Sequence, residues 1–186
     1  MLDKLEAASA LGGYDETIGA VRIAEVTGKS ILSVSTPLGG EASLATALKS
    51  AHGADVPGAG QVTVGNGATF LGLARDQFFV LTDDLGPWPE KRVAEALGGS
   101  GYVTDQSDSW VILRVSGTDS REALARICPI DLHPAAFGKG SLARTSMEHL
   151  GAIIIAEGGD EFLLMSARSS AASFLHAVTT SAKNIS

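Results

Sequence analysis

The sequence predicts an α+β fold built from two similar modules, each an antiparallel sheet covered by helices. Short apolar runs recur in the order strand, strand, helix, and this order favours antiparallel sheets with helices on one face. Glycine and proline separate the runs, as expected at turns. The stretch FLGLARDQFFVLTD and its helix also resemble AIIIAEGGDEFLLMSAR and its helix, which indicates an internal repeat. The repeat aligns Asp76 with Asp160, Phe78 with Phe162 and Leu81 with Met165.

The domain organisation follows from length and composition. A chain of 186 residues can form one generous domain or two small fused modules. On folding it can bury about 70% of the surface that its unfolded chain exposes, so it needs no disulfide or metal ion to stabilise it. We expect residues 1–19 to form an N-terminal arm. Residues 20–186 are expected to form one compact unit of two fused modules, about 20–100 and 101–186.

The first module begins with two runs of alternating apolar residues, VRIAEV and SILSVST, separated by a turn at Gly28. This pattern predicts a hairpin. A helix follows, with Leu44 and Leu48 one turn apart. Three further strands are predicted at QVTVG, ATFLGLA and QFFVLTD. Pro89 then opens a second helix that carries Val93 on its apolar side.

The second module repeats the cycle. The runs GYVTDQS and WVILRVS predict two strands. Thr118 is a candidate N-cap, since its hydroxyl can accept a bond from a first-turn amide, and Leu124 lies on the helix that follows. After a loop at 129–140, the strands LGAIIIAE and DEFLLMSA flank Gly158. The last helix presents Phe174 to the core.

Composition excludes several classes of function. The formal net charge is -7 and the basic residues are scattered, so binding of nucleic acid through its phosphates is not expected. Nowhere do about 18 apolar residues run together, so no membrane span is expected. A single cysteine fits a reducing, cytoplasmic location. Charged residues make up only 19%, which indicates either an unusually large core or apolar surface that meets a partner.

Histidine and cysteine give no catalytic or metal-binding pattern. None of the four histidines pairs with another at the spacing that zinc sites need. His133 lies two residues from Asp131, a spacing that could orient an imidazole, but Pro134 favours a rigid turn. Cys128 follows a helix and adjoins a proline, so a buried, inert thiol is predicted.

The glycine-rich and acidic motifs also favour structural roles. Gly65-Asn66-Gly67 is followed by a strand, whereas a dinucleotide loop would open a helix, so a hairpin turn is predicted. The segment 138–141, GKGS, lies in a coil that lacks the pattern of a phosphate-binding loop. The acidic pairs Asp83-Asp84 and Asp105/Asp108 adjoin turn formers, which favours capping or turn roles over acid–base chemistry. We therefore assign no catalytic, cofactor-binding or metal-binding residue to this chain.

Several phrases of the chain are similar to a known family. They are VRIAEV, GADVPGAGQVTVGNGATFLGLARDQFFVLTD, VTDQSDSWVILRVSG and ARICPIDLHPAAFGKGSLARTSMEHLGAIII. The phrase from Cys128 to Pro134, followed by Phe137, is typical of this family. The chain resembles the gamma subunit of heterotetrameric sarcosine oxidase, a family related to the folate-binding aminomethyltransferase fold. One departure is the run from Ala74 to Phe78, because relatives often end this run with tryptophan.

The resemblance implies a role in an oxidase complex. Such complexes oxidise the N-methyl group of sarcosine to give glycine, hydrogen peroxide and either formaldehyde or methylenetetrahydrofolate. The resemblance places FAD, FMN, NAD, tetrahydrofolate and zinc on the partner alpha, beta and delta subunits. It implies no cofactor and no catalytic residue in the gamma chain, which would be a structural subunit of an oxidoreductase.

The loop that contains the family phrase is our candidate for contact with another subunit. We expect Leu132, Pro134 and Phe137, together with the N-terminal arm, to form this interface. Two other functions remain open. One is a stand-alone folate-binding protein or aminomethyltransferase-like enzyme, although such proteins are longer and the motif of their iron–sulfur assembly branch is absent. The other is a free-standing interaction module, which shares the composition but not the family phrases.

Overall fold

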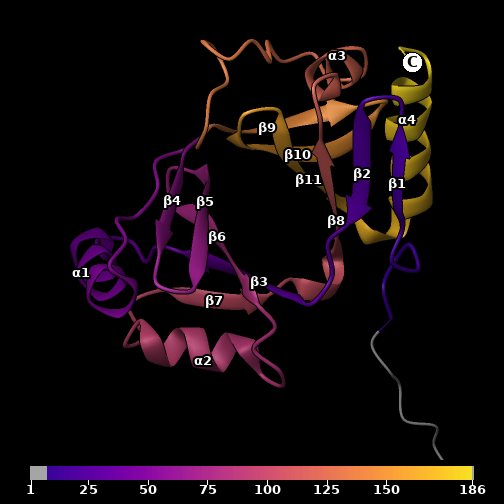
Figure 1. The fold of residues 1–186 in the computed structure, drawn as a ribbon. Helices are drawn as coiled ribbons and strands as arrows, with labels where there is room; N and C mark the ends of the chain where they lie inside the picture. Colours follow the sequence, from indigo (N-terminus) through magenta and orange to yellow (C-terminus); the bar gives the residue numbers. More distant parts are fainter. Residues whose placement is uncertain (1–7, 186) are drawn as a thin grey trace, which may run out of the picture.

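The computed structural model describes residues 8–185, which form two antiparallel sheets (Figure 1). This arrangement confirms the predicted α+β class. The first sheet has six strands, in the order β1 (Asp15–Ile18), β2 (Val21–Glu25), β8 (Trp110–Ser116), β11 (Glu161–Ala167), β10 (Leu150–Gly158) and β9 (Leu142–Met147). The second has five, in the order β4 (Val62–Gly65), β5 (Ala68–Ala74), β6 (Gln77–Asp83), β3 (Lys29–Ser35) and β7 (Tyr102–Asp105).

Helices cover the outer face of each sheet. The second sheet packs against α1 (Glu41–His52) and α2 (Pro89–Ala96), and the first against α3 (Ser120–Ala125) and α4 (Ala171–Lys183). A third apolar layer lies between the two sheets, because successive residues of a strand point to opposite faces. On β10, Ile154 faces the helices while Ile153 and Ile155 face the other sheet. Burial on both faces explains why this strand is an unbroken apolar run.

The two halves of the chain repeat one structure, as the sequence predicted. The β5–β6 and β10–β11 hairpins carry a register shift at the same place, Gly72/Ala74 and Ala156/Gly158. Phe78 pairs with Gly72 and Phe162 pairs with Ala156, so the predicted alignment of the two phenylalanines is confirmed. Phe78 is buried and packs edge-on against Phe70. A ring without a polar group suits this apolar site.

Reciprocal hydrogen bonds join the equivalent edges of the two sheets. The isolated bridge between Gln61 and Ser141 links the segment before β4 to the segment before β9. The flanking bonds run in both directions: Val62 N donates to Gly140 O at 3.0 Å, and Leu142 N donates to Gly60 O at 2.9 Å. The segments 58–61 and 138–141 therefore occupy equivalent places. The GKGS segment is thus part of a sheet junction.

The predicted hairpin between VRIAEV and SILSVST is wrong. Both runs are strands, but β2 pairs with β1 and β8 in the first sheet, whereas β3 pairs with β6 and β7 in the second. The backbone continues along β8 after β2, since Val26 N donates to Ile112 O at 2.9 Å. Its counterpart after β7 is Gln106 N, which donates to Ile31 O at 2.8 Å. The first half of the chain therefore contributes β1 and β2 to the first sheet, and the second half contributes β7 to the second sheet.

Three smaller features also differ from the sequence prediction. Thr118 is not the N-cap of α3: the helix begins at Ser120 after Asp119, and no side chain caps it. The Thr118 hydroxyl donates to Asp119 instead, at 3.1 Å. Strand β9 was not predicted, and β1 lies within the segment expected to be an arm, of which residues 1–7 fall outside the described part. No helix among residues 8–185 is long and apolar enough to cross a bilayer.

Candidate subunit-contact site

The loop between α3 and β9 holds the three residues predicted to contact a partner. Leu132 and Phe137 are only 4% and 5% exposed, and both belong to the apolar cluster beneath α3 and α4. Their side chains therefore anchor the loop to its own chain. Pro134 is exposed, as are its neighbours His133 and Ala135. The surface that the loop can offer to another protein is thus the segment 133–136.

Local hydrogen bonds give this segment a defined shape. The Asp131 carboxylate accepts a bond from His133 N at 2.9 Å, and His133 Nδ1 accepts one from Ala135 N at 3.2 Å. His133 O accepts two more bonds, from the amides of Ala136 and Phe137, each at 2.8 Å. Asp131 and His133 therefore both hold backbone amides in a tight turn. This agrees with the rigid turn predicted from Pro134.

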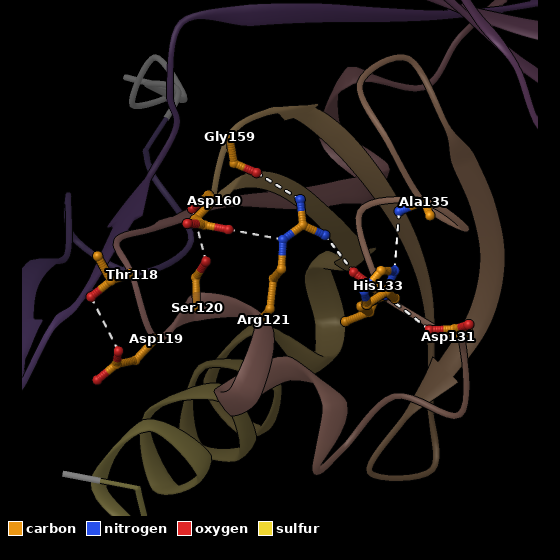
Figure 2. A network of polar contacts seen from close by, with 10 residues as sticks. Thr118, Asp119, Ser120, Arg121, Asp131, His133, Ala135, Gly159 and Asp160 are labelled. Carbon is orange, nitrogen blue, oxygen red and sulfur yellow. Dashed lines mark hydrogen bonds and ion pairs between the residues drawn. The ribbon is translucent and has the colours of Figure 1, made fainter.

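Arg121 ties the loop to the rest of the second module (Figure 2). Its guanidinium donates to Leu132 O, to Gly159 O at 2.6 Å and to the Asp160 carboxylate at 2.8 Å. It also lies over the ring of Phe162, 4.9 Å from the centroid. The fork of guanidinium donors can bind several acceptors at once, which suits this position where three segments meet. Arg121 thus joins α3, the loop and the turn between β10 and β11.

Sequence reasoning missed Arg121, although one signal was available. The residue lies in the first turn of α3, where a positive charge opposes the helix dipole. A cation in that place indicates an acceptor outside the helix. Here the acceptors are two loop carbonyls and one carboxylate, so the side chain is only 18% exposed despite its charge.

Of the acidic pairs, Asp84 and Asp105 have the turn roles that the sequence predicted, whereas Asp83 forms an ion pair. Lys29 donates to Asp83 at 2.6 Å, and this bond lowers the pKa of the Asp83 carboxyl. Asp84 and Asp105 each accept a bond from the amide two residues further on, at 2.8 and 2.9 Å. Such bonds are typical of Asx turns. The carboxylates of these three residues therefore hold turns and one surface ion pair.

The remaining candidates also have defined places. Gly65 pairs with Ala68 across a tight turn, so the predicted hairpin at 65–67 is confirmed. Cys128 is 5% exposed, and burial raises the pKa of its thiol, as expected for an inert cysteine. Within residues 8–185, no group of three or more His, Cys, Asp or Glu side chains could hold a metal ion.

The described part of the N-terminal segment lies against the first sheet. The Glu25 carboxylate accepts bonds from Leu11 N at 3.1 Å and Gly13 N at 2.8 Å, while Arg168 donates to Ala8 O. Residues 8–13 are therefore held by the same chain. The N-terminal arm remains a proposed contact, and residues 1–7 of it lie outside the described part of the chain.

Comparison with known proteins gives consistent results at the level of sequence. Residues 39–183 match the model of the sarcosine oxidase gamma subunit family. The gamma subunit of sarcosine oxidase from Arthrobacter sp. is 30% identical over 152 residues, which cover 80% of this chain and 73% of the relative. The gamma subunit from Corynebacterium sp. strain P-1 is 28% identical over 153 residues, with the same two coverages.

Solved structures show the same fold. A chain of the heterotetrameric sarcosine oxidase from Corynebacterium sp. U-96 matches 91% of this chain and 87% of its own length, with 26% identity and a TM-score of 0.78. The glycine cleavage system aminomethyltransferase T from Bartonella henselae is 13% identical, with a TM-score of 0.59, and shares the fold over 44% of its length. The chain therefore belongs to the sarcosine oxidase gamma subunit family.

Proposed function

We propose that this chain is the non-catalytic structural subunit of a heterotetrameric sarcosine oxidase. It would bind the folded forms of the alpha, beta and delta subunits and so stabilise the assembled complex. The observation that carries the proposal is the family match, supported by the similarity of 91% of this chain to a chain of a heterotetrameric sarcosine oxidase. The internally braced loop, with its exposed segment 133–136, is the proposed place of contact.

The chemistry of the complex would take place on the other subunits. In this proposal they hold FAD, FMN, NAD, tetrahydrofolate and zinc, and they oxidise sarcosine to glycine. Hydrogen peroxide and either formaldehyde or methylenetetrahydrofolate would be the further products. The carboxylates of Asp84, Asp105 and Asp131 accept bonds from backbone amides, and Arg121 donates to backbone carbonyls, which supports a structural role.

Co-purification tests this proposal. The chain would be produced with an affinity tag in its native host, and the captured proteins identified by mass spectrometry and flavin absorbance. We expect three further subunits at equal stoichiometry, with sarcosine-dependent production of hydrogen peroxide. Recovery of the chain alone, together with unchanged oxidase activity after deletion of its gene, would contradict the proposal.

The likeness to aminomethyltransferase T favours a second candidate, a stand-alone folate-binding protein or aminomethyltransferase-like enzyme. That likeness concerns the fold, and this chain corresponds to less than half of the enzyme. Titration of the purified chain with tetrahydrofolate, followed by tryptophan fluorescence, separates the two candidates. Saturable micromolar binding by the chain alone would favour the second one.

A further inference from the structure

His133 uses its imidazole to hold a backbone amide in the exposed turn at 133–136 (Figure 2). Its Nδ1 accepts a hydrogen bond from Ala135 N at 3.2 Å. A backbone amide can only donate, so Nδ1 carries no hydrogen, and the ring is the neutral form with its hydrogen on Nε2. The tautomer of His133 is therefore set by the turn itself.

Elsewhere in the chain the same kind of bond is made by aspartate. The carboxylates of Asp84, Asp105 and Asp131 each accept a bond from the amide two residues further on, at 2.8, 2.9 and 2.9 Å. Aspartate, asparagine and serine are preferred in this role, because their short side chains reach the amide directly. The turn does not need a histidine at 133. What histidine adds is a second polar atom on the far side of the ring.

That second atom, Nε2, is a free hydrogen-bond donor. His133 is exposed, and none of the described residues binds its Nε2. The ring cannot turn Nε2 inward without losing the bond from Ala135 N. The backbone of His133 is fixed as well, because its N–H and C=O groups make the three turn bonds described above. The donor is therefore held in one direction before any partner binds, which lowers the entropy cost of binding.

The surface around this donor is apolar. His133 is the only polar side chain at 133–136, since the other three residues are one proline and two alanines. Leu132 and Phe137 on either side are buried in the cluster beneath α3 and α4, so the segment has a rigid base. A partner that covers 133–136 therefore meets an apolar surface with a single side-chain donor. That donor needs an acceptor once water is excluded.

The tautomer indicates which acceptor fits. A carboxylate at Nε2 would favour the doubly protonated imidazolium, because an opposite charge stabilises the charged form. In that form Nδ1 also carries a hydrogen, which would face Ala135 N–H and remove the bond that shapes the turn. A second carboxylate would also be repelled by Asp131, which lies in the same turn. A neutral acceptor keeps every bond of the turn, and the backbone carbonyl is the neutral acceptor that every residue offers.

We propose that His133 donates a hydrogen bond from Nε2 to a backbone carbonyl of another subunit, with the proline and alanine side chains of the turn packed around that contact. This inference rests on the proposed function and names a residue that determines the specificity of the contact at 133–136. A protein that offers a donor at the same place would leave two N–H groups opposed, so this bond also rejects wrong partners.

Two substitutions separate the roles of the two nitrogens. His133→Asn keeps an acceptor for Ala135 N, but its amide nitrogen ends one atom short of the Nε2 position. His133→Gln extends a donor to about the Nε2 position but places no acceptor where Nδ1 lies. His149→Asn is the matched control, since His149 is exposed in the turn between β9 and β10 at a φ of 69°, which asparagine tolerates.

Competition with the unmodified chain for incorporation into the complex gives the first readout, and the thermal midpoint of the full-length chain gives the second. We expect H133N to keep its midpoint within about 2 °C but to be incorporated at least about tenfold less. H133Q should show the reverse order, with a lower midpoint and better incorporation than H133N. H149N should match the unmodified chain in both assays. Wild-type incorporation of H133N would overturn the proposal.

Salt distinguishes a carbonyl from a carboxylate on the partner. A bond between neutral groups is hardly screened, so the preference for the unmodified chain over H133N should stay the same between about 0.05 and 0.5 M salt. A preference that falls as salt is added would indicate a charged acceptor and overturn the proposed carbonyl.

The outcomes separate this inference from the function on which it rests. If the unmodified chain captures no oxidase subunit, both proposals fall. If it captures them and H133N competes equally, only the inference about His133 falls. If H133N is unfolded, the natural sequence decides through hydrogen–deuterium exchange at the Cε1 position of its histidines, followed by mass spectrometry. His133 should exchange more slowly in the complex than in the free full-length chain, and an equal rate would overturn the proposal.

Discussion

Replacement of Arg121 by alanine should destabilise the chain far more than removal of an exposed arginine. The guanidinium donates to Leu132 O, Gly159 O and Asp160, and its side chain is 18% exposed. Hydrogen bonds from a charged group contribute about 1.5–3 kcal/mol each when well buried. The Asp160 bond counts for less, about 1 kcal/mol or below, because that carboxylate is 43% exposed. We therefore expect a loss of at least about 3 kcal/mol for R121A.

Two further variants serve as references for this prediction. Arg121→Lys keeps the charge but loses the fork geometry, so it should cost about 1–2 kcal/mol. Arg22→Ala removes an ion pair whose side chains are 58% and 48% exposed to solvent, so it should cost much less stability than R121A. Urea denaturation followed by tryptophan fluorescence gives the free energy of unfolding of each variant. If R121A and R22A lose the same stability, Arg121 does not hold the loop as described.

Three further predictions concern stability, reactivity and pH. Gly117→Ala should cost above about 3 kcal/mol of stability, because a Cβ there would lie 1.9 Å from Ala20 O at a φ of 116°. At Gly151 an added Cβ meets open space, so Gly151→Ala should cost below about 1 kcal/mol. Thermal unfolding of the two variants compares these losses. Cys128 should react with Ellman's reagent at pH 8 only as the protein unfolds, and rapid labelling of the folded chain would contradict its burial. Burial, followed by the effect of a nearby glutamate, raises the pKa of Tyr14 to about 12, above its ordinary value near 10. Its contribution to stability is therefore complete below pH 10 and is lost as the pH rises from 10 to 12; urea titrations at pH 9–12 should show less pH dependence in Tyr14→Phe.

The local pattern of the sequence was sufficient to predict the individual elements. Leu44 and Leu48 lie one turn apart, and both are buried on α1, because a helix brings residues four apart onto one face. The aligned Phe78 and Phe162 occupy equivalent buried positions. These features depend on residues close together in the chain, which is the range over which hydrophobic periodicity acts.

The pairing of strands was not predictable in the same way. The turn at Gly28 looked like a hairpin turn, yet β2 and β3 enter different sheets. Any amphipathic strand can pair with several others, and the choice depends on contacts far away in sequence. The loop shows the same limit: Leu132, Pro134 and Phe137 are similarly apolar, but only the fold shows that Pro134 alone is exposed.

The internal repeat explains why Leu132 and Phe137 anchor the loop between α3 and β9 in the core. Segments 36–57 and 117–137 connect equivalent strands in the two halves. The first contains the twelve-residue α1, whereas the second contains the six-residue α3 followed by the loop. In the first half α1 fills the core with Leu44 and Leu48, while in the second the loop places Leu132 and Phe137 in the corresponding cluster.

Where the first half has the second part of α1, the second half therefore has a loop, which also places apolar side chains in the core but adds an exposed turn. Core packing does not need that turn, since a helix fills the equivalent place in the other half. The edges of the two sheets are a second departure from the repeat: β1 pairs with the outer side of β2, whereas β7 ends its sheet and has α2 beside it (Figure 1). The proposed contact at 133–136 therefore follows from a comparison between the two halves of the same chain.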